Sequence, residues 1–261
     1  MLSLMPRGEL RILQFECFGP EILQAVFSRH GGVSPEPWAS LNLGGTVGDD
    51  PQRVGENRRR AFAAMQRDPP SLFDVWQVHG VDVVIADAPR PPQARHEQAD
   101  AILTDKPGVT LLMRFADCVP ILLHDPIRHV AGIAHAGWLG SVRGTVRAAV
   151  EAMRSHYSCQ PGNILAAIGP SIGPDHYEVG MNVISQVRQT FGQDATGLLA
   201  TRDGRAFLDL WAANRLLLER TGVTRIECSG ICTACSTGDW FSHRAEKGRT
   251  GRFGAMIGLK A

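Results

Sequence analysis

The chain has 261 residues, of which 44% are hydrophobic and 20% charged, a composition typical of a globular protein with a large core. Its net charge is +1 and its Lys and Arg residues form no block, which argues against a protein that binds nucleic acid. No secretory signal opens the chain and its most apolar stretch, 109–123, is interrupted by Arg114 and Asp117, so we expect a cytoplasmic protein that does not cross a membrane.

Strand-like segments rich in β-branched and aromatic residues recur along the chain, each bounded by Gly, Pro or Asp. We expect strands at 10–18, 23–27, 72–78, 81–86, 109–115, 119–123, 130–135, 164–168, 224–228 and 255–259. Helical periodicity follows Asp50 and Pro51 as far as Met65, and it recurs at 142–153 and from 208 to Gly222. Because strands often follow one another directly, the pattern predicts an α+β fold in which helices pack on mixed or antiparallel sheets. No linker divides the chain, and we expect one domain over residues 1–261.

Three residues in unusual short strings carry most of the chemical information. They are His79 in QVHG (77–80), Cys118 in ADCVP (116–120) and His135 in AHAGW (134–138). Two imidazoles and one thiolate form a complete protein ligand set for a catalytic zinc, whose fourth position stays open. The same groups could instead form a cysteine nucleophile with two candidate bases. They are too far apart in sequence to share one helix face, so we expect them to converge from the ends of separate strands.

Each residue has a simpler reading, in which His79 only makes a hydrogen bond and Cys118 is a small buried hydrophobe. Their settings favour a site. Asp117 puts a charge beside the thiol within an apolar run, and a buried carboxylate requires a partner. Two small residues follow His135 before Trp138, which lets a ligand approach the backbone beside an aromatic wall. Asp117 is therefore a fourth candidate catalytic residue, to orient a ligand or to move a proton.

The remaining thiols and several polar residues also have a simpler reading and a functional one. Cys232 and Cys235 form a C-x-x-C pair after Cys228, but the only later histidine is His243. We interpret these cysteines as structural or incidental thiols rather than a second metal site. The candidate substrate-binding residues occur in distinctive surroundings, although an arginine more often forms a structural ion pair. They are Arg29, Asn42 and Arg244.

At the level of whole strings, the chain resembles the YfiH family, also called the laccase-domain or multicopper polyphenol oxidase-like family. The similarity runs nearly from end to end. Besides the three strings above, it is carried by SRHGGVS (28–34), SLNLG (40–44), VGD (47–49), NR (57–58), ADA (99–101), IGPSI (168–172), YEV (177–179), CTAC (232–235), FSHR (241–244) and KGRTGR (247–252).

The resemblance implies that His79, Cys118 and His135 are zinc ligands and that the fold is a mixed β-sandwich flanked by helices. It also implies phosphorolysis of adenosine, inosine and methylthioadenosine to base and sugar 1-phosphate, together with adenosine deamination. The partners are then a small nucleoside and phosphate. The resemblance leaves three alternatives: a cysteine hydrolase or amidase that acts on peptidoglycan precursors through Cys118, a copper polyphenol oxidase, and a non-enzymatic binding module.

One position departs from the family pattern. The string after the second histidine is commonly HAGWRG, and Leu139 replaces its arginine here. A guanidinium beside a metal would favour an anionic substrate, so its loss bears on phosphate binding. Arg143, one helical turn further on, is the candidate replacement. The glycine-rich segments 140–144 and 169–173 fit neither a Walker loop nor a dinucleotide fingerprint, and we expect no ATP or NAD cofactor.

Overall fold

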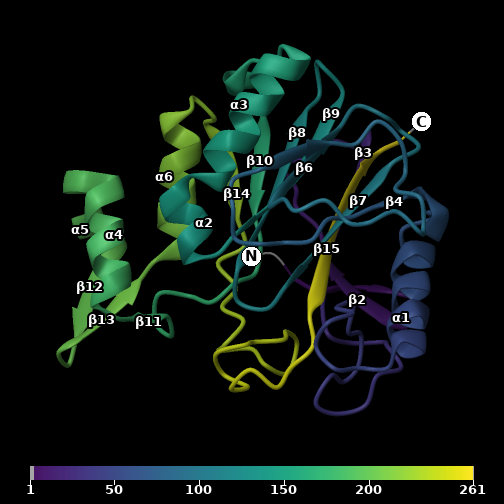
Figure 1. Ribbon diagram of the computed structural model, residues 1–261, viewed down its shortest axis with the longest axis horizontal. Coiled ribbons are helices and arrows are strands. Elements are labelled where there is room, and N and C mark those ends of the chain that lie inside the picture. Colours follow the sequence, from purple (N-terminus) through teal and green to yellow (C-terminus); the bar gives the residue numbers. More distant parts are fainter. Residues whose placement is uncertain (1–2, 261) are drawn as a thin grey trace.

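The computed structural model describes residues 3–260 and contains two six-stranded sheets (Figure 1). The first sheet has the order β1 (Met5–Arg7), β2 (Leu10–Leu13), β3 (Ile22–Phe27), β15 (Phe253–Leu259), β7 (Thr110–Phe115), β4 (Leu72–Phe73). The second has the order β14 (Arg225–Cys228), β10 (Leu165–Ile168), β8 (Val119–Asp125), β9 (Val130–Ala136), β6 (Ala101–Thr104), β5 (Val83–Ile85). Most neighbours are antiparallel, but β4–β7, β5–β6 and β10–β14 are parallel, so both sheets are mixed.

The two sheets share one apolar core and each also buries its outer face. Met113 and Ile257 of the first sheet pack in the same cluster as Leu122 and Ile133 of the second. Their neighbours along the strands point the other way, as Leu112 does toward a separate cluster beneath a helix. Strands covered on both faces read as continuous apolar runs rather than as alternating patterns. This explains the long apolar stretch in the sequence without a membrane segment.

Helices cover the outer faces. The first sheet is covered by α1 (Pro51–Ala64), and the second by α3 (Thr145–Tyr157) and α6 (Leu210–Arg220) (Figure 1). Helix α4 (Met181–Phe191) packs on other helices further out rather than on either six-stranded sheet. A three-stranded sheet lies to one side, with the order β11 (Glu178–Val179), β13 (Arg205–Leu208), β12 (Leu199–Arg202). The short helices are α2 (Trp138–Arg143), α5 (Ala195–Leu198) and three 3₁₀ turns at Pro69–Ser71, Pro161–Asn163 and Gly192–Asp194. The expected α+β class and helix-flanked mixed β-sandwich are confirmed.

Several expected elements have different bounds. The strand expected at 10–18 ends at Leu13, because the side chain of Gln24 bonds both backbone groups of Phe15 in place of a strand partner. The strand expected at 72–78 ends at Phe73. The helix expected at 142–153 is broken by Gly144, whose φ of 87° ends α2 before α3 begins. The sequence analysis missed β1, β6, the three-stranded sheet and α4. No helix within residues 3–260 is long and apolar enough to cross a membrane.

Candidate active site

His79 lies in the loop between β4 and β5 rather than at a strand end, which corrects the expectation from the sequence. Its φ of 57° is in the left-handed region, which residues other than glycine rarely adopt. This conformation is held from both sides, because Asp100 Oδ2 accepts the N–H of Val78 at 3.0 Å and that of Gly80 at 2.6 Å. Backbone of this kind clusters at functional sites, where the surrounding structure fixes it.

Cys118 and His135 come from two neighbouring strands of the second sheet. Cys118 directly precedes β8, after a bend at Asp117, whose φ is 81°. Strands β8 and β9 pair antiparallel with Pro120 opposite His135, so the thiol and the imidazole meet at the same end of this hairpin. The expectation that Cys118 sits at the break between two strands is confirmed.

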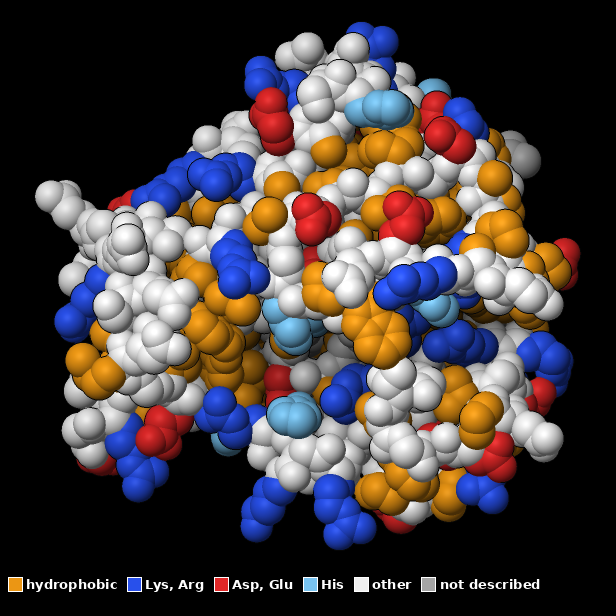
Figure 2. Space-filling model, in the orientation of Figure 1, with side chains coloured by type: hydrophobic (Ala, Val, Ile, Leu, Met, Phe, Trp, Pro, Cys, Tyr) orange, Lys and Arg blue, Asp and Glu red, His pale blue; other side chains and the backbone are white. Residues whose placement is uncertain are grey.

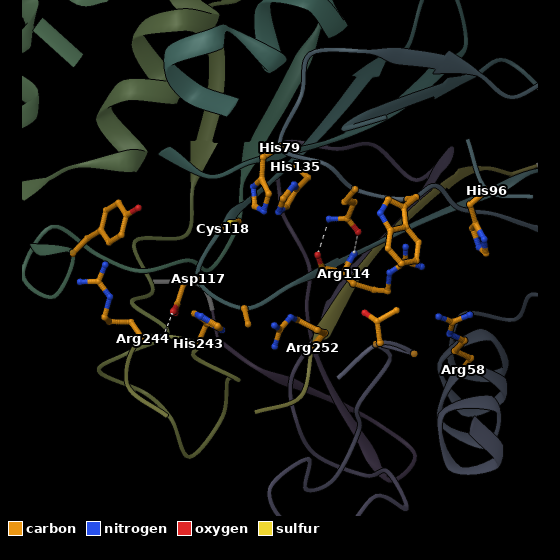
Figure 3. Close-up of a pocket in the computed structure, with 17 residues that line it drawn as sticks. Arg58, His79, His96, Arg114, Asp117, Cys118, His135, His243, Arg244 and Arg252 are labelled. Carbon is orange, nitrogen blue, oxygen red and sulfur yellow. Dashed lines mark hydrogen bonds between the residues drawn. The ribbon is translucent and has the colours of Figure 1, made fainter. Parts of the chain in front are cut away.

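The structure brings the three residues together at one point (Figure 3). One ligand atom from each lies within 4.8 Å of the others, and the ring centroids of His79 and His135 are 4.9 Å apart. Gly137 is required beside them, because a Cβ there would lie 2.7 Å from Cys118 Sγ and 3.4 Å from His79 Nδ1. The small residues after His135 therefore make room for the cluster itself.

A buried carboxylate completes the arrangement, and the sequence analysis gave it no role. Asp100 Oδ1 is 2.7 Å from His135 Nδ1, which leaves Nε2 as the imidazole nitrogen able to bind a metal. Histidine ligands of metals are commonly oriented by a carboxylate in this way. Asp100 thus fixes the ring of His135 directly and the loop of His79 through its backbone. The signal in the sequence was a carboxylate between two alanines, which needs a buried partner.

The electrostatics of the cluster suit a bound cation. Burial alone would raise the pKa of the Cys118 thiol, but His135 and hydrogen bonds to both imidazoles lower it below its usual value. Burial would lower the pKa of His135, and the attraction of Cys118 and Asp100 raises it instead. Cys118 is thus held as a thiolate, the form that binds metals. Two imidazoles, a thiolate and an orienting carboxylate fit a zinc site with an open fourth position.

Asp117 has a structural role beside the cluster. Its Oδ1 accepts from Thr233 Oγ1 at 2.6 Å and from Ser242 Oγ at 2.7 Å, and its Oδ2 accepts from the backbone N–H of Arg244 at 2.6 Å. The carboxylate therefore fastens the C-terminal loops to the bend that carries Cys118. These three donors hold the carboxylate of Asp117 in one orientation at the edge of the cavity.

The cluster opens into a cavity of about 690 Å³, a volume that suits a small ligand. The cavity is lined by one carboxylate and many basic side chains (Figure 3). In Figure 2 blue and pale-blue side chains surround a hollow in the middle of this face. The basic and acidic lining residues outside the cluster are Arg58, His96, Arg114, Asp117, His243, Arg244 and Arg252. The excess of positive charge suits an anionic group.

Of the expected substrate-binding residues, only Arg244 lines this cavity, with its guanidinium 5.1 Å from the ring centroid of Tyr177. Arg29 is engaged elsewhere, since it bonds Ala39 O and Thr237 O, pairs with Glu246 at 3.0 Å and lies over Phe241. Asn42 is fully buried and bonds the backbone of Gly44 and Arg252, so it shapes the cavity wall from behind.

Arg143 is exposed and donates to the backbone oxygen of His79 at 3.3 Å, outside the set of cavity-lining residues. Arg252 is one of the arginines that line the cavity. Its Nη1 donates to Thr250 O and Gly251 O, and its Nε and Nη2 have no hydrogen-bond partner among residues 3–260. Burial lowers the pKa of this guanidinium against the opposing effect of nearby Cys118. Sequence reasoning included Arg252 only as part of the string KGRTGR.

The fold and the cavity define an α+β protein with a candidate metal site of two histidines and one cysteine. Comparison with known proteins then identifies the family. The model of the family described as multi-copper polyphenol oxidoreductase laccase matches residues 23–260, and the chain belongs to this family. The resemblance inferred from the sequence strings is thereby confirmed.

Relatives and solved structures agree with this assignment. The chain is 43% identical to a protein of Deinococcus radiodurans named purine nucleoside phosphorylase, over 90% of this chain and 88% of that one. The crystal structure of YlmD from Geobacillus stearothermophilus matches with a TM-score of 0.92 and 34% identity, covering 98% of both chains. The hypothetical protein YfiH of Bacillus licheniformis matches with the same TM-score, 32% identity and 99% coverage of both chains.

Proposed function

We propose that this protein is a zinc-dependent purine nucleoside phosphorylase that cleaves adenosine, inosine and methylthioadenosine. The observation that carries the proposal is one cavity in which the His79–Cys118–His135 cluster lies near a guanidinium with unused donors. The names of the relatives support the reaction class. The ligand set supports zinc, because imidazole and thiolate together suit this ion.

In the proposed reaction a phosphate oxygen attacks C1′ of the sugar, the C1′–N9 bond breaks, and its electron pair leaves with the purine. Arg252 would hold the phosphate through Nε and Nη2, a charge-assisted contact that positions the nucleophile. Trp76 lines the cavity with 51% of its surface exposed, and it offers a face on which the purine can stack. His243 lines the same cavity and can deliver the proton that the leaving base requires.

The metal would be held by His79, Cys118 and His135 with Asp100 orienting His135. When bound, zinc supplies a Lewis acid that stabilises negative charge developing in the reaction. The protein contributes the rest through its own side chains, by fixing the ligands and holding phosphate beside the sugar. Adenosine deamination does not require phosphate as a second anion. It is tested in the same samples by measuring the release of ammonia.

The test compares Arg252→Gln with Arg143→Gln. We expect Arg252→Gln to raise the KM for phosphate about ten- to a hundredfold, the equivalent of one lost charge-assisted contact of about 1.5–3 kcal/mol. The KM for inosine should change little, and deamination, where present, should persist. Arg143→Gln is the control, because this residue is exposed and outside the cavity. A larger effect of Arg143→Gln would restore the interpretation made from the sequence, and zinc-loaded wild-type protein without phosphorolysis would refute the function.

A cysteine hydrolase acting on peptidoglycan precursors is the second candidate. It is favoured by the contacts of the Cys118 thiol with two imidazoles, which also describe an activated nucleophile. Alkylation of Cys118 with and without a chelator separates the two functions. A zinc-bound thiolate reacts only after the metal is removed, whereas a free nucleophile reacts at once.

Copper is the alternative metal, since the family description includes it and a blue-copper site also uses two histidines and a cysteine. A multicopper oxidase needs more imidazoles than the groups of metal-binding side chains in residues 3–260 provide. Elemental analysis of purified protein, with His79→Ala and Cys118→Ala as controls, decides between the metals. Several coppers per chain with strong visible absorption would favour the oxidase.

A further inference from the structure

A second group of metal-binding side chains lies outside the cluster at His79. Cys235 Sγ is 3.4 Å and Cys232 Sγ is 3.8 Å from His176 Nδ1, and one ligand atom from each residue lies within 4.8 Å of the others. The spacing of the cysteines did not reveal this group, because its histidine does not follow them. His176 precedes them, and the later His243 lines the main cavity instead.

These distances match those required around a zinc ion. With Zn–S of about 2.3 Å and Zn–N of about 2.05 Å, a tetrahedral centre separates sulfur from nitrogen by about 3.6 Å. The two separations of 3.4 Å and 3.8 Å in the structure lie on either side of this value. His176 and Cys235 are exposed, so an ion can enter and a water molecule can take the fourth position. Thiolate and imidazole ligands favour zinc over magnesium or calcium.

The two loops that provide these ligands also form a wall of the main cavity. Cys232 pairs with Ser171 in an isolated β-bridge, and the N–H of Gly173 donates to Cys232 Sγ at 3.2 Å. Between the two cysteines, Thr233 donates to Asp117, the residue that bends the chain at Cys118. Tyr177, next to His176, lines the cavity. An ion here would join the loop that carries Tyr177 to the segment that holds Asp117.

We propose that His176, Cys232 and Cys235 bind a second divalent ion of the zinc class, which fastens these two loops together. This site is separate from the proposed catalytic zinc and does not depend on the reaction that the protein performs. Its role is structural. An ion held by three ligands from two loops would restrict the motion of both loops and so fix the wall of the cavity.

The experiment isolates the second site in the double variant H79A/C118S, which keeps only His135 of the first ligand set. Reduced protein is loaded with Co²⁺ or Zn²⁺, freed of excess ion and analysed for metal content. We expect two equivalents in the wild type and one in the double variant. The cobalt form of the double variant should retain a thiolate-to-metal charge-transfer band, and Zn²⁺ should raise its Tm.

Adding H176A or C235S to that double variant should abolish the remaining equivalent, the cobalt band and the rise in Tm. Adding C228S should change none of them, because Cys228 is a half-buried thiol outside the group.

Three results would overturn the proposal. The first is that the double variant binds no ion. The second is that its one equivalent of bound ion remains after C235S is added. The third is a Cys232–Cys235 disulfide that persists in reducing buffer while metal is absent. Failure of the proposed catalytic function would look different. In that case the wild type would still bind an ion that is lost with C235S, but it would perform no phosphorolysis.

Discussion

Replacing Asp100 with asparagine removes the negative charge that connects the two candidate metal-binding histidines. Asp100 Oδ1 lies 2.7 Å from His135 Nδ1, while Oδ2 accepts two backbone N–H groups on either side of His79. Both carboxylate oxygens therefore act as acceptors in the wild type. Asparagine keeps one acceptor oxygen and puts an NH₂ group in place of the other.

Either orientation of the new amide disturbs the site. If its NH₂ group faces His135, Nδ1 must accept, so the ring proton moves to Nε2, the nitrogen left to bind metal. If its NH₂ group faces the loop, it opposes the N–H groups of Val78 and Gly80, and the conformation of His79 loses its support. Loss of such an orienting partner typically weakens metal binding about ten- to a hundredfold, or about 1.4–2.7 kcal/mol. We expect the upper end, since both histidines are affected.

The assay is a competition titration of zinc against a chromophoric chelator, with Asp82→Asn as the control. Asp82 is an exposed carboxylate near the same loop, and its backbone oxygen accepts the N–H of Asp100. The control should bind zinc as the wild type does. Wild-type affinity in Asp100→Asn, with an unchanged Tm, would refute the role assigned to Asp100.

Two further predictions concern packing and charge. Gly137→Ala should abolish zinc binding at the first site and leave the fold intact, because its Cβ would lie 2.7 Å from Cys118 Sγ. The matched control is Gly180→Ala, since Gly180 is also an extended helix N-cap but has open space around it. Metal analysis and Tm are measured for both variants. Asp74→Asn should lower the free energy of unfolding at pH 7 by about 3–5 kcal/mol, because the partly buried Arg90 and Arg114 lose the fully buried carboxylate with which they pair. Burial alone would raise the pKa of Asp74, but Arg114 and other cations lower it. The stabilisation by the ionised carboxylate is therefore present above the ordinary carboxyl pKa of about 3.9, and it is lost as the pH falls through the lowered value. Urea titrations should therefore show the free energies of unfolding of the wild type and Asp74→Asn converging in acid. A difference between them that stays constant with pH would contradict the stabilising role of the ionised Asp74.

The strands of the central sandwich were predictable because their apolar runs are strong and local. Those at Thr110–Phe115, Val119–Asp125 and Val130–Ala136 agree closely with the expected 109–115, 119–123 and 130–135. The strand expected at 10–18 fails for a tertiary reason, because a side chain from β3 replaces its backbone partner. No local pattern contains that information.

The candidate metal-binding residues were predictable from residue types, and the contacts that hold them together were not. His79, Cys118 and His135 form a known ligand combination, so their chemistry was visible before their geometry. The contact of Asp100 with His135 and with the loop of His79 joins positions that are distant in the chain. Likewise, helical spacing pointed from Leu139 to Arg143, whereas the cavity receives Arg252 from the segment before β15. Sequence proximity does not decide which charge fills a cavity when the walls come from different sheets.

The charge balance explains why the absence of an arginine at position 139 is compatible with the proposed phosphate binding. Asp74 is fully buried and is contacted by Arg90 at 2.9 Å and by Arg114, with Arg58 at 4.0 Å. One carboxylate cannot neutralise all of these cations, so a net positive potential remains at this end of the cavity. Arg114 and Arg58 are held by Asp74 and backbone oxygens, which makes them a fixed field rather than flexible ligands. Arg252 keeps two donors free within that field. An anion can thus be attracted by the fixed cations and bound by Arg252, and neither step requires a guanidinium at position 139.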